Sequence, residues 1–439
     1  MSADSAVSAP NFPPVRRREI FGWCCFDFAN SAYVTIIVTV VYFPYFTKVV
    51  AGGHAAAAAW WGLTLAAAQL AVLLVSPLIG AISDIRANKK AWLAGTATTC
   101  AVSTLALAAV GPGEIWLALG LVGLATAAFY LSENICAGFL PEISTPANAG
   151  RISGYGWSFG YFGGLLCLVL ALYMIEGRGW PVPRVFTMTG VFFALAALPT
   201  LLLLRERAVP RPPPPGRSVL AEGWGENLRS LRGLAAPGQR VLAMFFVSLF
   251  FATAGLTAIV AFASGFAETV IGYSTPEVLK LFVVLQLAGV AGASGFGYLQ
   301  DRTSPKLALC LALGLWIVVC VAAWACPAGA KGAFYAVGIG AGVAMGAFQA
   351  GGRAVVALFT PEGKSGEYFG FWGFFSKLAG VVGQPVFGLL VAWLGYRTAI
   401  LANAGFFLAG LLVLLPLALR PAKASKTTSC GCSGRIEVN

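Results

Sequence analysis

The chain has 439 residues, of which 58% are hydrophobic and only 10% are charged, and its mean hydropathy is +0.81. A typical soluble domain is about 45–50% apolar and about 25% charged, so this composition excludes a soluble enzyme, a disordered chain and a collagen-like chain. The formal net charge of +12 does not indicate a nucleic-acid partner, because membrane proteins concentrate Lys and Arg in the loops on one side of the bilayer. The apolar runs are long and continuous rather than alternating, which predicts an all-α membrane protein embedded in lipid.

Long apolar runs divide the chain into two groups of six. The first six lie at residues 20–47, 55–83, 91–110, 115–139, 152–175 and 185–204, and the second six at 241–266, 278–299, 307–326, 332–359, 368–394 and 398–419. Since about 20 apolar residues cross a bilayer as one helix, we expect twelve transmembrane helices. The predicted domains are an N-terminal tail (1–19), a six-helix bundle (20–204), a linker (205–239), a second six-helix bundle (240–420) and a C-terminal tail (421–439).

Basic residues gather on one side of these predicted helices. The N-terminal tail carries the run Arg16–Arg18, and the linker carries several arginines around the consecutive prolines Pro212–Pro215. Because loops rich in Lys and Arg stay in the cytoplasm, we expect both termini and the linker there, with the protein in the inner membrane of a bacterium. Prolines in series stop a helix, and residues 218–231 after them are predicted to form an amphipathic surface helix.

No residue pattern indicates a cofactor or a metal site. His54 is the only histidine and stands alone in a predicted outer loop, and the spacing of the ten cysteines fits neither a disulfide framework nor a zinc site. Cys430 and Cys432 in the C-terminal tail leave two interpretations, a thiol pair for a soft metal or arsenite and, more simply, a flexible tail. We therefore expect no metal and no cofactor.

The two groups of helices share short motifs at a nearly constant offset. Gly80 and Asp84 end the second apolar run, and Gly297 and Asp301 end the eighth, about 217 positions later. Basic residues follow both pairs, namely Arg86, Lys89 and Lys90 in the first case and Arg302 in the second. Phe-Leu-Pro-Glu at 139–142 likewise matches Phe-Thr-Pro-Glu at 359–362. Such a repeat predicts two homologous halves related by an axis along the membrane normal.

Twelve predicted helices in two repeated halves, with a basic loop after the second and the eighth, resemble the major facilitator superfamily. A narrower resemblance lies in the first run, where residues 27–33 read Asp-Phe-Ala-Asn-Ser-Ala-Tyr and are similar to a signature of the autophagy-related vacuole-effluxer branch. Leu-Pro-Glu at 140–142 and the stretch rich in glycine and aromatic residues at 154–164 agree with that branch. The resemblance implies the major facilitator fold and a basic loop that clamps neighbouring helix ends.

The resemblance also implies a function. We expect a secondary active transporter that moves a small polar solute by alternating access and is a monomer without a nucleic-acid partner. No phosphate-binding loop occurs in the sequence, which disfavours ATP-driven transport, and no catalytic constellation indicates an enzyme. Amino acids are the first expectation for the substrate, because fungal members of the branch are associated with amino-acid export from the vacuole. The alternatives are an exporter of drugs, lipids or metalloid conjugates, and a membrane sensor or scaffold that transports nothing.

Four charged residues inside predicted helices are the main functional candidates, since a charge within a bilayer is costly. Asp27 lies in the first helix and Lys377 in the eleventh, while Glu133 and Arg353 each stand eight residues before a repeated proline, near the inner ends of helices four and ten. We predict a charge network across the interface of the two halves that closes the inner side. Protonation of Asp27 or Glu133 would weaken it and couple transport to a proton gradient. The alternative is static ion pairing between helices.

Neutral polar and small residues complete the set of candidates. Amide, hydroxyl and phenol groups near the charges can contact a solute or simply link helices: Asn30, Ser31, Tyr33, Asn134, Gln349 and Gln384. Glycines in the fifth run allow close approach of another backbone: Gly156, Gly160, Gly163 and Gly164. Such close contact suits either a rocking movement of the halves or static packing.

Overall fold

The computed structural model describes residues 14–54, 56–211, 216–234 and 240–419. Within these ranges every regular element is a helix, which confirms the predicted all-α fold class. The thiol pair at Cys430 and Cys432 and the four prolines at 212–215 lie outside the described residues, as do the C-terminal tail and most of the N-terminal one.

The N-terminal half, called the N-half below, contains helices α1 to α8. Its long helices are α1 (Arg17–Tyr33), α3 (Ala57–Arg86), α4 (Lys89–Ala106), α5 (Ile115–Ala137), α7 (Ala149–Leu172) and α8 (Pro183–Leu203). Short elements extend or connect them: η1 (Val34–Val40), α2 (Tyr42–Tyr45), η2 (Phe46–Val50), η3 (Leu107–Ala109), α6 (Leu140–Ile143) and η4 (Tyr173–Gly177). The first span therefore runs beyond the predicted 20–47. It turns π-helical on both sides of Pro44, a residue that cannot donate the backbone hydrogen bond of an α-helix.

The C-terminal half, called the C-half, contains helices α10 to α14. They are α10 (Arg240–Phe266) with its extension η6 (Ala267–Ile271), α11 (Thr275–Arg302), α12 (Pro305–Ala325), α13 (Lys331–Phe359) and α14 (Ser365–Leu414). Between the halves, α9 (Val219–Leu234) stands where the sequence predicts an amphipathic helix over 218–231. The helix thus begins one residue later and ends three residues later than expected.

Eleven described helices are long and apolar enough to cross a membrane, and the last of them makes two crossings. α14 has 50 residues, which would make a straight helix of about 75 Å, against about 30 Å for the hydrocarbon core. Gly395 breaks it with a φ of 75°, a value that favours glycine. Ser365–Leu414 thus provides the predicted eleventh and twelfth spans, and the chain is a multi-pass membrane protein.

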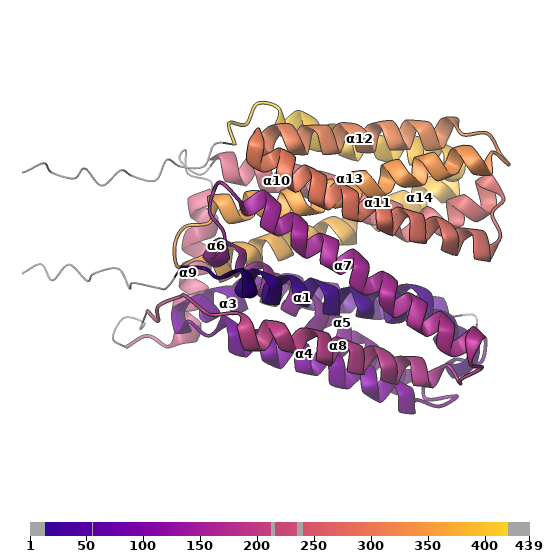
Figure 1. Ribbon diagram of the computed structural model, residues 1–439, viewed down its shortest axis with the longest axis horizontal. Coiled ribbons are helices and arrows are strands. Elements are labelled where there is room, and N and C mark those ends of the chain that lie inside the picture. Colours follow the sequence, from indigo (N-terminus) through magenta and orange to yellow (C-terminus); the bar gives the residue numbers. More distant parts are fainter. Residues whose placement is uncertain (1–13, 55, 212–215, 235–239, 420–439) are drawn as a thin grey trace, which may run out of the picture.

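The two halves lie side by side with their long helices roughly parallel, and α7 and α11 lie where they meet (Figure 1). We call the surface between the halves the seam; it is formed by α7 with α11 and α13, and by α3 and α5 with α14. Glycines bring the backbones together there, because a Cβ at Gly80 would overlap the Gly366 carbonyl and one at Gly154 would lie 2.5 Å from the Ala293 carbonyl oxygen. Small residues suit a seam in lipid, where helices associate through close packing.

One end of the bundle carries α6, α9 and the start of α1, and we call it the α9 side (Figure 1). Among the described residues, the hydrogen bonds and ion pairs that join the halves lie in the part of the seam nearest this side. They involve Gly150–Tyr161 on α7, Val290–Asp301 on α11, Gln349–Arg353 on α13 and Ser365–Lys377 on α14. Polar contacts therefore hold the seam closed at the α9 side.

Candidate functional site: two ion pairs and two clamps across the seam

The first ion pair across the seam joins Asp27 on α1 to Arg353 on α13. Arg353 Nη1 lies 2.8 Å from Asp27 Oδ2, and Arg353 is only 2% exposed. The guanidinium also contacts α7, where Nε donates to Ser153 Oγ (3.2 Å) and Nη2 donates to the Ser153 carbonyl oxygen (3.0 Å). Arg353 thus has an opposite charge and hydrogen-bond acceptors around it, which burial of a charged group requires.

Two indole rings enclose the Arg353 guanidinium. Its central carbon lies 4.6 Å from the ring centre of Trp23 on α1 and 5.2 Å from that of Trp157 on α7. The face of an indole attracts a cation, so both rings favour the charged arginine at this position. Trp23 and Ser153 were missing from the sequence-based candidates. Trp23 stands four residues before Asp27 and hence on the same face of the helix, which is the signal that points to it.

Gly156 on α7 makes room for this ion pair. A Cβ at this position would overlap Asp27 Oδ2 and would lie 2.5 Å from Arg353 Nη2 and 2.8 Å from the Trp23 ring. Gly156 thus faces the Asp27–Arg353 ion pair directly.

Gly156→Ala is expected to destabilise the protein, because overpacking a tight site costs about 1–3 kcal/mol and the displaced atoms belong to an ion pair. Thermal unfolding of the purified protein measures this as a fall in Tm. Gly95→Ala on α4 is the matched control, since nothing lies within 4 Å of a Cβ there, and it should leave Tm unchanged or raise it. Equal melting temperatures for the two variants would contradict the packing role of Gly156.

The second ion pair joins Glu133 on α5 to Lys377 on α14, with 3.5 Å between Glu133 Oε2 and Lys377 Nζ. The same ammonium lies 3.4 Å from the ring centre of Tyr130. Beside it, Asn134 donates to Ser76 Oγ on α3 (2.8 Å). The structure therefore brings the four predicted charges together as two separate pairs, each with one member in either half, and their role in gating stays a prediction.

Nearer the α9 side, two aspartates clamp the halves together by the same geometry. Asp84 at the end of α3 accepts the backbone N–H groups of residues 366–367, in the first turn of α14, both at 2.9 Å. Asp301 at the end of α11 accepts those of residues 150–151, in the first turn of α7, at 2.8 and 2.9 Å. First-turn N–H groups have no partner within their own helix and carry its positive dipole end, so a carboxylate suits them well. Each half thus caps a helix of the other.

A buried lysine supports only one of these clamps. Lys89 at the start of α4 is 1% exposed, contacts Glu142 and Ser365, and lies 3.6 Å from Asp84 Oδ1. At the other clamp the cation is Arg151, whose side chain is 42% exposed and lies 3.5 Å from the Asp301 carboxylate. The repeated motif therefore gives a more deeply buried contact between α3 and α14 than between α7 and α11.

The remaining basic residues of the two loops differ in their surroundings. Lys90 Nζ donates to the Leu204 carbonyl oxygen at the end of α8 (2.8 Å). Glu206, in the linker, accepts the backbone N–H of Lys90 (3.3 Å), and burial raises the pKa of its carboxyl. Arg86 and Arg302 are exposed. Gly297 packs its backbone against Gly150, which brings Asp301 close to α7. No sequence signal points to Glu206, because its contact joins distant positions in the chain.

Two of the neutral candidates, Gln349 and Asn30, stand close to the first ion pair along their helices, and Gln384 lies further along α14. Gln349 on α13 accepts a hydrogen bond from Tyr161 on α7 (2.7 Å), which joins the halves one turn away from Arg353. Asn30 on α1 is buried, and its Oδ1 has no hydrogen-bond partner among the described residues. Gln384 on α14 is half-buried. Asn30 stands three residues after Asp27 on α1, and Gln349 stands four residues before Arg353 on α13, so both amides belong to the helices that carry the first ion pair.

Two other candidates serve packing within the N-half. The Tyr33 hydroxyl shares a hydrogen bond with Thr126 Oγ1 (2.8 Å), and Tyr33 is fully buried. Ser31 Oγ donates to the backbone carbonyl of Asp27 (2.9 Å), one turn earlier on α1. Because these groups are already bonded inside one half, we leave both out of the proposed site.

Three of the predicted glycines of α7 pack mainly against α1 and its extension η1, whereas Gly150 and Gly154 of the same helix face the seam. A Cβ at Gly160 would lie 2.9 Å from Ser31 Oγ, one at Gly163 would overlap the Phe28 carbonyl, and one at Gly164 would lie 2.8 Å from Thr35 Oγ1. All three contacts stay within the N-half. These glycines therefore fix α7 to α1, so that Asp27 and Ser153 approach Arg353 from one rigid unit.

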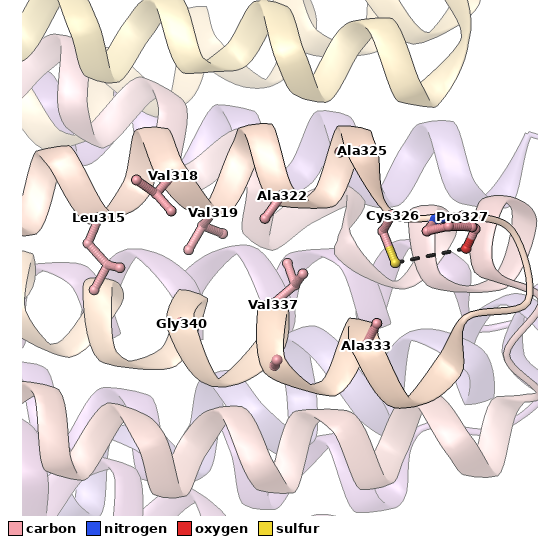
Figure 2. Close-up of a pocket in the computed structure, with 11 residues that line it drawn as sticks. Leu315, Val318, Val319, Ala322, Ala325, Cys326, Pro327, Ala333, Val337 and Gly340 are labelled. Atoms are coloured by element: carbon pink, nitrogen blue, oxygen red, sulfur yellow. Dashed lines mark hydrogen bonds between the residues drawn. The ribbon is translucent and has the colours of Figure 1, made fainter.

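An apolar crevice of about 430 Å³ lies elsewhere, between α12 and α13 of the C-half. Figure 2 shows its wall of small and branched side chains, which include Val318, Val319, Ala322 and Val337, with Cys326 and Pro327 at one end. The described residues that line this crevice carry no charge. The crevice is separate from the two ion pairs, and its apolar lining does not fit a polar solute.

Comparisons with known proteins agree with this architecture. Residues 49–427 match the family described as "Vacuole effluxer Atg22 like". The chain is 24% identical over 407 residues to a Bacillus subtilis protein named "Uncharacterized MFS-type transporter YxiO", which covers 89% of this chain and 93% of that protein. It is 25% identical over 306 residues to autophagy-related protein 22 of Yarrowia lipolytica, which covers 61% of this chain and about half of the fungal one, 49%.

Solved structures show the same fold at low sequence identity. The human organic anion transporter MFSD10 superposes with a TM-score of 0.76 at 15% identity, over 92% of this chain and 100% of that one. The proton:xylose symporter XylE gives 0.70 at 14% identity, over 91% and 95% of the two chains. The family match and the shared fold show that the chain belongs to the vacuole effluxer Atg22-like family and is a membrane transporter of the major facilitator superfamily.

Proposed function

We propose that this transporter moves a small polar solute, with amino acids as the first candidates, by alternating access between its two halves. The observation that carries the proposal is the pair of ion pairs Asp27–Arg353 and Glu133–Lys377, each divided between the halves. A passage on the α9 side cannot open without separating both pairs. The charges that would otherwise be costly inside a membrane therefore control which side of the seam is open.

The chemistry of the first pair supports a zwitterionic solute. An amino acid carries a carboxylate that can take the place of Asp27 at the Arg353 guanidinium, and an ammonium that can take the place of Arg353 at Asp27. Such an exchange satisfies both buried charges while the pair is apart. A solute without charges would leave both residues unpaired, which argues against a purely apolar substrate at this position.

We further propose that the α9 side is the cytoplasmic side of a bacterial inner membrane and that the protein acts as a monomer. Protons entering from the opposite side would neutralise Asp27 or Glu133 and weaken the pair to which each belongs. This links opening of the α9 side to a proton gradient. Export of drugs, lipids or metalloid conjugates is the second candidate, and a sensor that binds without transport is the third.

Reconstitution in proteoliposomes tests the transport proposal. Radiolabelled amino acids should accumulate or leave only in vesicles that contain the protein, and an imposed pH gradient should change the initial rate. Glu133→Gln and Lys377→Ala should each reduce this rate severalfold, because either change leaves the other charge without its partner.

Glu277→Gln is the matched control for these variants. Glu277 pairs with Lys331 inside the C-half, away from the seam, and this lysine lowers the pKa of Glu277 to about 2. Wild-type rates in both seam variants would contradict the gating role. Binding of amino acids without flux in the wild-type protein would favour the sensor, and flux of an apolar drug alone would favour the exporter.

A further inference from the structure

α9 presents an apolar stripe to its surroundings although it stands outside the twelve spans. Leu220, Trp224 and Leu228 are 59%, 55% and 42% exposed, and their spacing of four residues places them along one side of the helix. Gly223 and Asn227, on the side of α9 next to this stripe, are buried against the protein, and so is Glu222. An exposed stripe of this kind indicates an apolar or interfacial environment.

The depth at which α9 packs indicates which environment that is. A Cβ at Gly223 would lie 3.1 Å from Ile82 and 3.7 Å from Leu78, both on α3. These two residues stand about 6 and 12 Å before the end of α3 at Arg86, at about 1.5 Å per residue. α9 therefore lies beside the last turns of a membrane-spanning helix rather than beyond its end (Figure 1).

The apolar surface of α3 leads directly to α9. Leu74 is 63% exposed on the outer surface of α3, and Leu78 and Ile82 follow it at the same spacing of four residues. Since α9 covers the last two, the stripe with Trp224 continues the lipid-facing surface of the spanning helix. Tryptophan in such a position is typical of the boundary between acyl chains and headgroups.

The charges of α9 have the arrangement of an interfacial helix. Glu222 pairs with Arg217 and Arg229, and the Arg229 guanidinium holds the pKa of this carboxyl below its usual value. Arg232, one turn after Leu228, is exposed at the end of the apolar stripe. Exposed arginines beside an apolar stripe can reach the phosphates of lipid headgroups while the stripe lies among the acyl chains.

We propose that α9 docks on the lipid leaflet of the α9 side, with Leu220, Trp224 and Leu228 inserted at the boundary of headgroups and acyl chains. The occupant of this surface is the bilayer itself rather than a second protein. The proposal is independent of the transported solute. Neighbouring contacts tie the docked segment to both halves, since Arg211 donates to the Gly363 carbonyl (2.8 Å) while its own N–H donates to the Ile85 carbonyl (2.8 Å).

A fluorescent thiol label at position 224 tests the docking. In the parent chain, Cys430 and Cys432 are replaced by serine. The Trp224→Cys variant of this chain is reconstituted in lipid nanodiscs and labelled with an environment-sensitive dye. Spin-labelled lipids with the nitroxide near the headgroup should quench this dye strongly, whereas iodide in the water should quench it weakly. His54→Cys is the control, because His54 is exposed in a loop between spans and should show the reverse.

The two quenchers separate the possible outcomes. Quenching of position 224 by iodide as strongly as position 54 would place the stripe in water and overturn the proposal. Protection from both quenchers would mean that protein covers the stripe, and this result would overturn it as well. The cysteines that remain in the described part of the parent chain are buried or half-buried, so they should take up little dye. Any dye signal from them is measured on the parent chain without an added cysteine and is subtracted.

Discussion

Arg353→Ala is expected to lower the rate of transport at least about tenfold and to destabilise the protein strongly. The change removes the only cation within 4 Å of the Asp27 carboxylate among the described residues, and breaking a buried pair by removing one partner costs about 3–5 kcal/mol. The variant also loses the Asp27–Arg353 contact that helps to hold the seam closed on the α9 side. A shift of about 1.4 kcal/mol changes the ratio of two states tenfold, so the initial rate of flux should fall by at least about that factor.

The double variant Asp27→Asn with Arg353→Gln separates a gate from a static pair. It removes both charges while polar side chains remain at both positions, so the melting temperature should recover much of what Arg353→Ala loses. If the pair is a gate that a charged solute opens, flux should stay low in the double variant. Recovery of flux together with stability would show that the pair only holds α1 to α13, and wild-type flux in Arg353→Ala alone would contradict any role.

The fold could be predicted from the sequence because its signals repeat, and the repeat also marks the two loops in which the clamps lie, although it does not say what each aspartate binds. Apolar runs report the spans directly, and the spacing of Gly80 and Asp84 recurs at Gly297 and Asp301. In the structure both aspartates cap a helix of the other half. The break at Gly395, inside the 50 residues of α14, falls between the predicted eleventh span, which ends at 394, and the twelfth, which begins at 398.

The pairing of the four intramembrane charges could not be predicted in the same way. Asp27 and Arg353 are 326 positions apart in the sequence, so only the packing of the halves decides that they meet and that Glu133 meets Lys377 instead. Nothing in the sequence favours Asn30 over Tyr33, since both are polar groups one or two turns from Asp27. In the structure the Tyr33 hydroxyl is buried and bonded within one half, so Tyr33 is no longer a candidate for contact with a solute. Asn30 remains one, because its Oδ1 has no hydrogen-bond partner among the described residues.

Removing either clamp should shift the protein toward a state that is open on the α9 side. Asp84→Ala leaves two first-turn N–H groups of α14 without an acceptor, and Asp301→Ala does the same for α7. The larger effect is expected for Asp84, because its clamp is buried beside Lys89, whereas the Asp301 clamp borders the half-exposed Arg151. A buried polar group that loses its partner costs about 1–3 kcal/mol, enough to change the ratio of the states severalfold or more.

Pulsed electron spin resonance measures this shift between the halves. Spin labels at Arg86→Cys on α3 and Arg302→Cys on α11 occupy exposed positions on opposite sides of the seam, in a chain with serine at Cys430 and Cys432. The fraction at long distance should rise in the order wild type, Asp301→Ala, Asp84→Ala, and each Asp→Asn variant should fall between its alanine counterpart and the wild type. Identical distance distributions in all variants would mean that the clamps do not restrain the seam, which would then be held closed by the two ion pairs and the other polar contacts between the halves, such as Tyr161–Gln349.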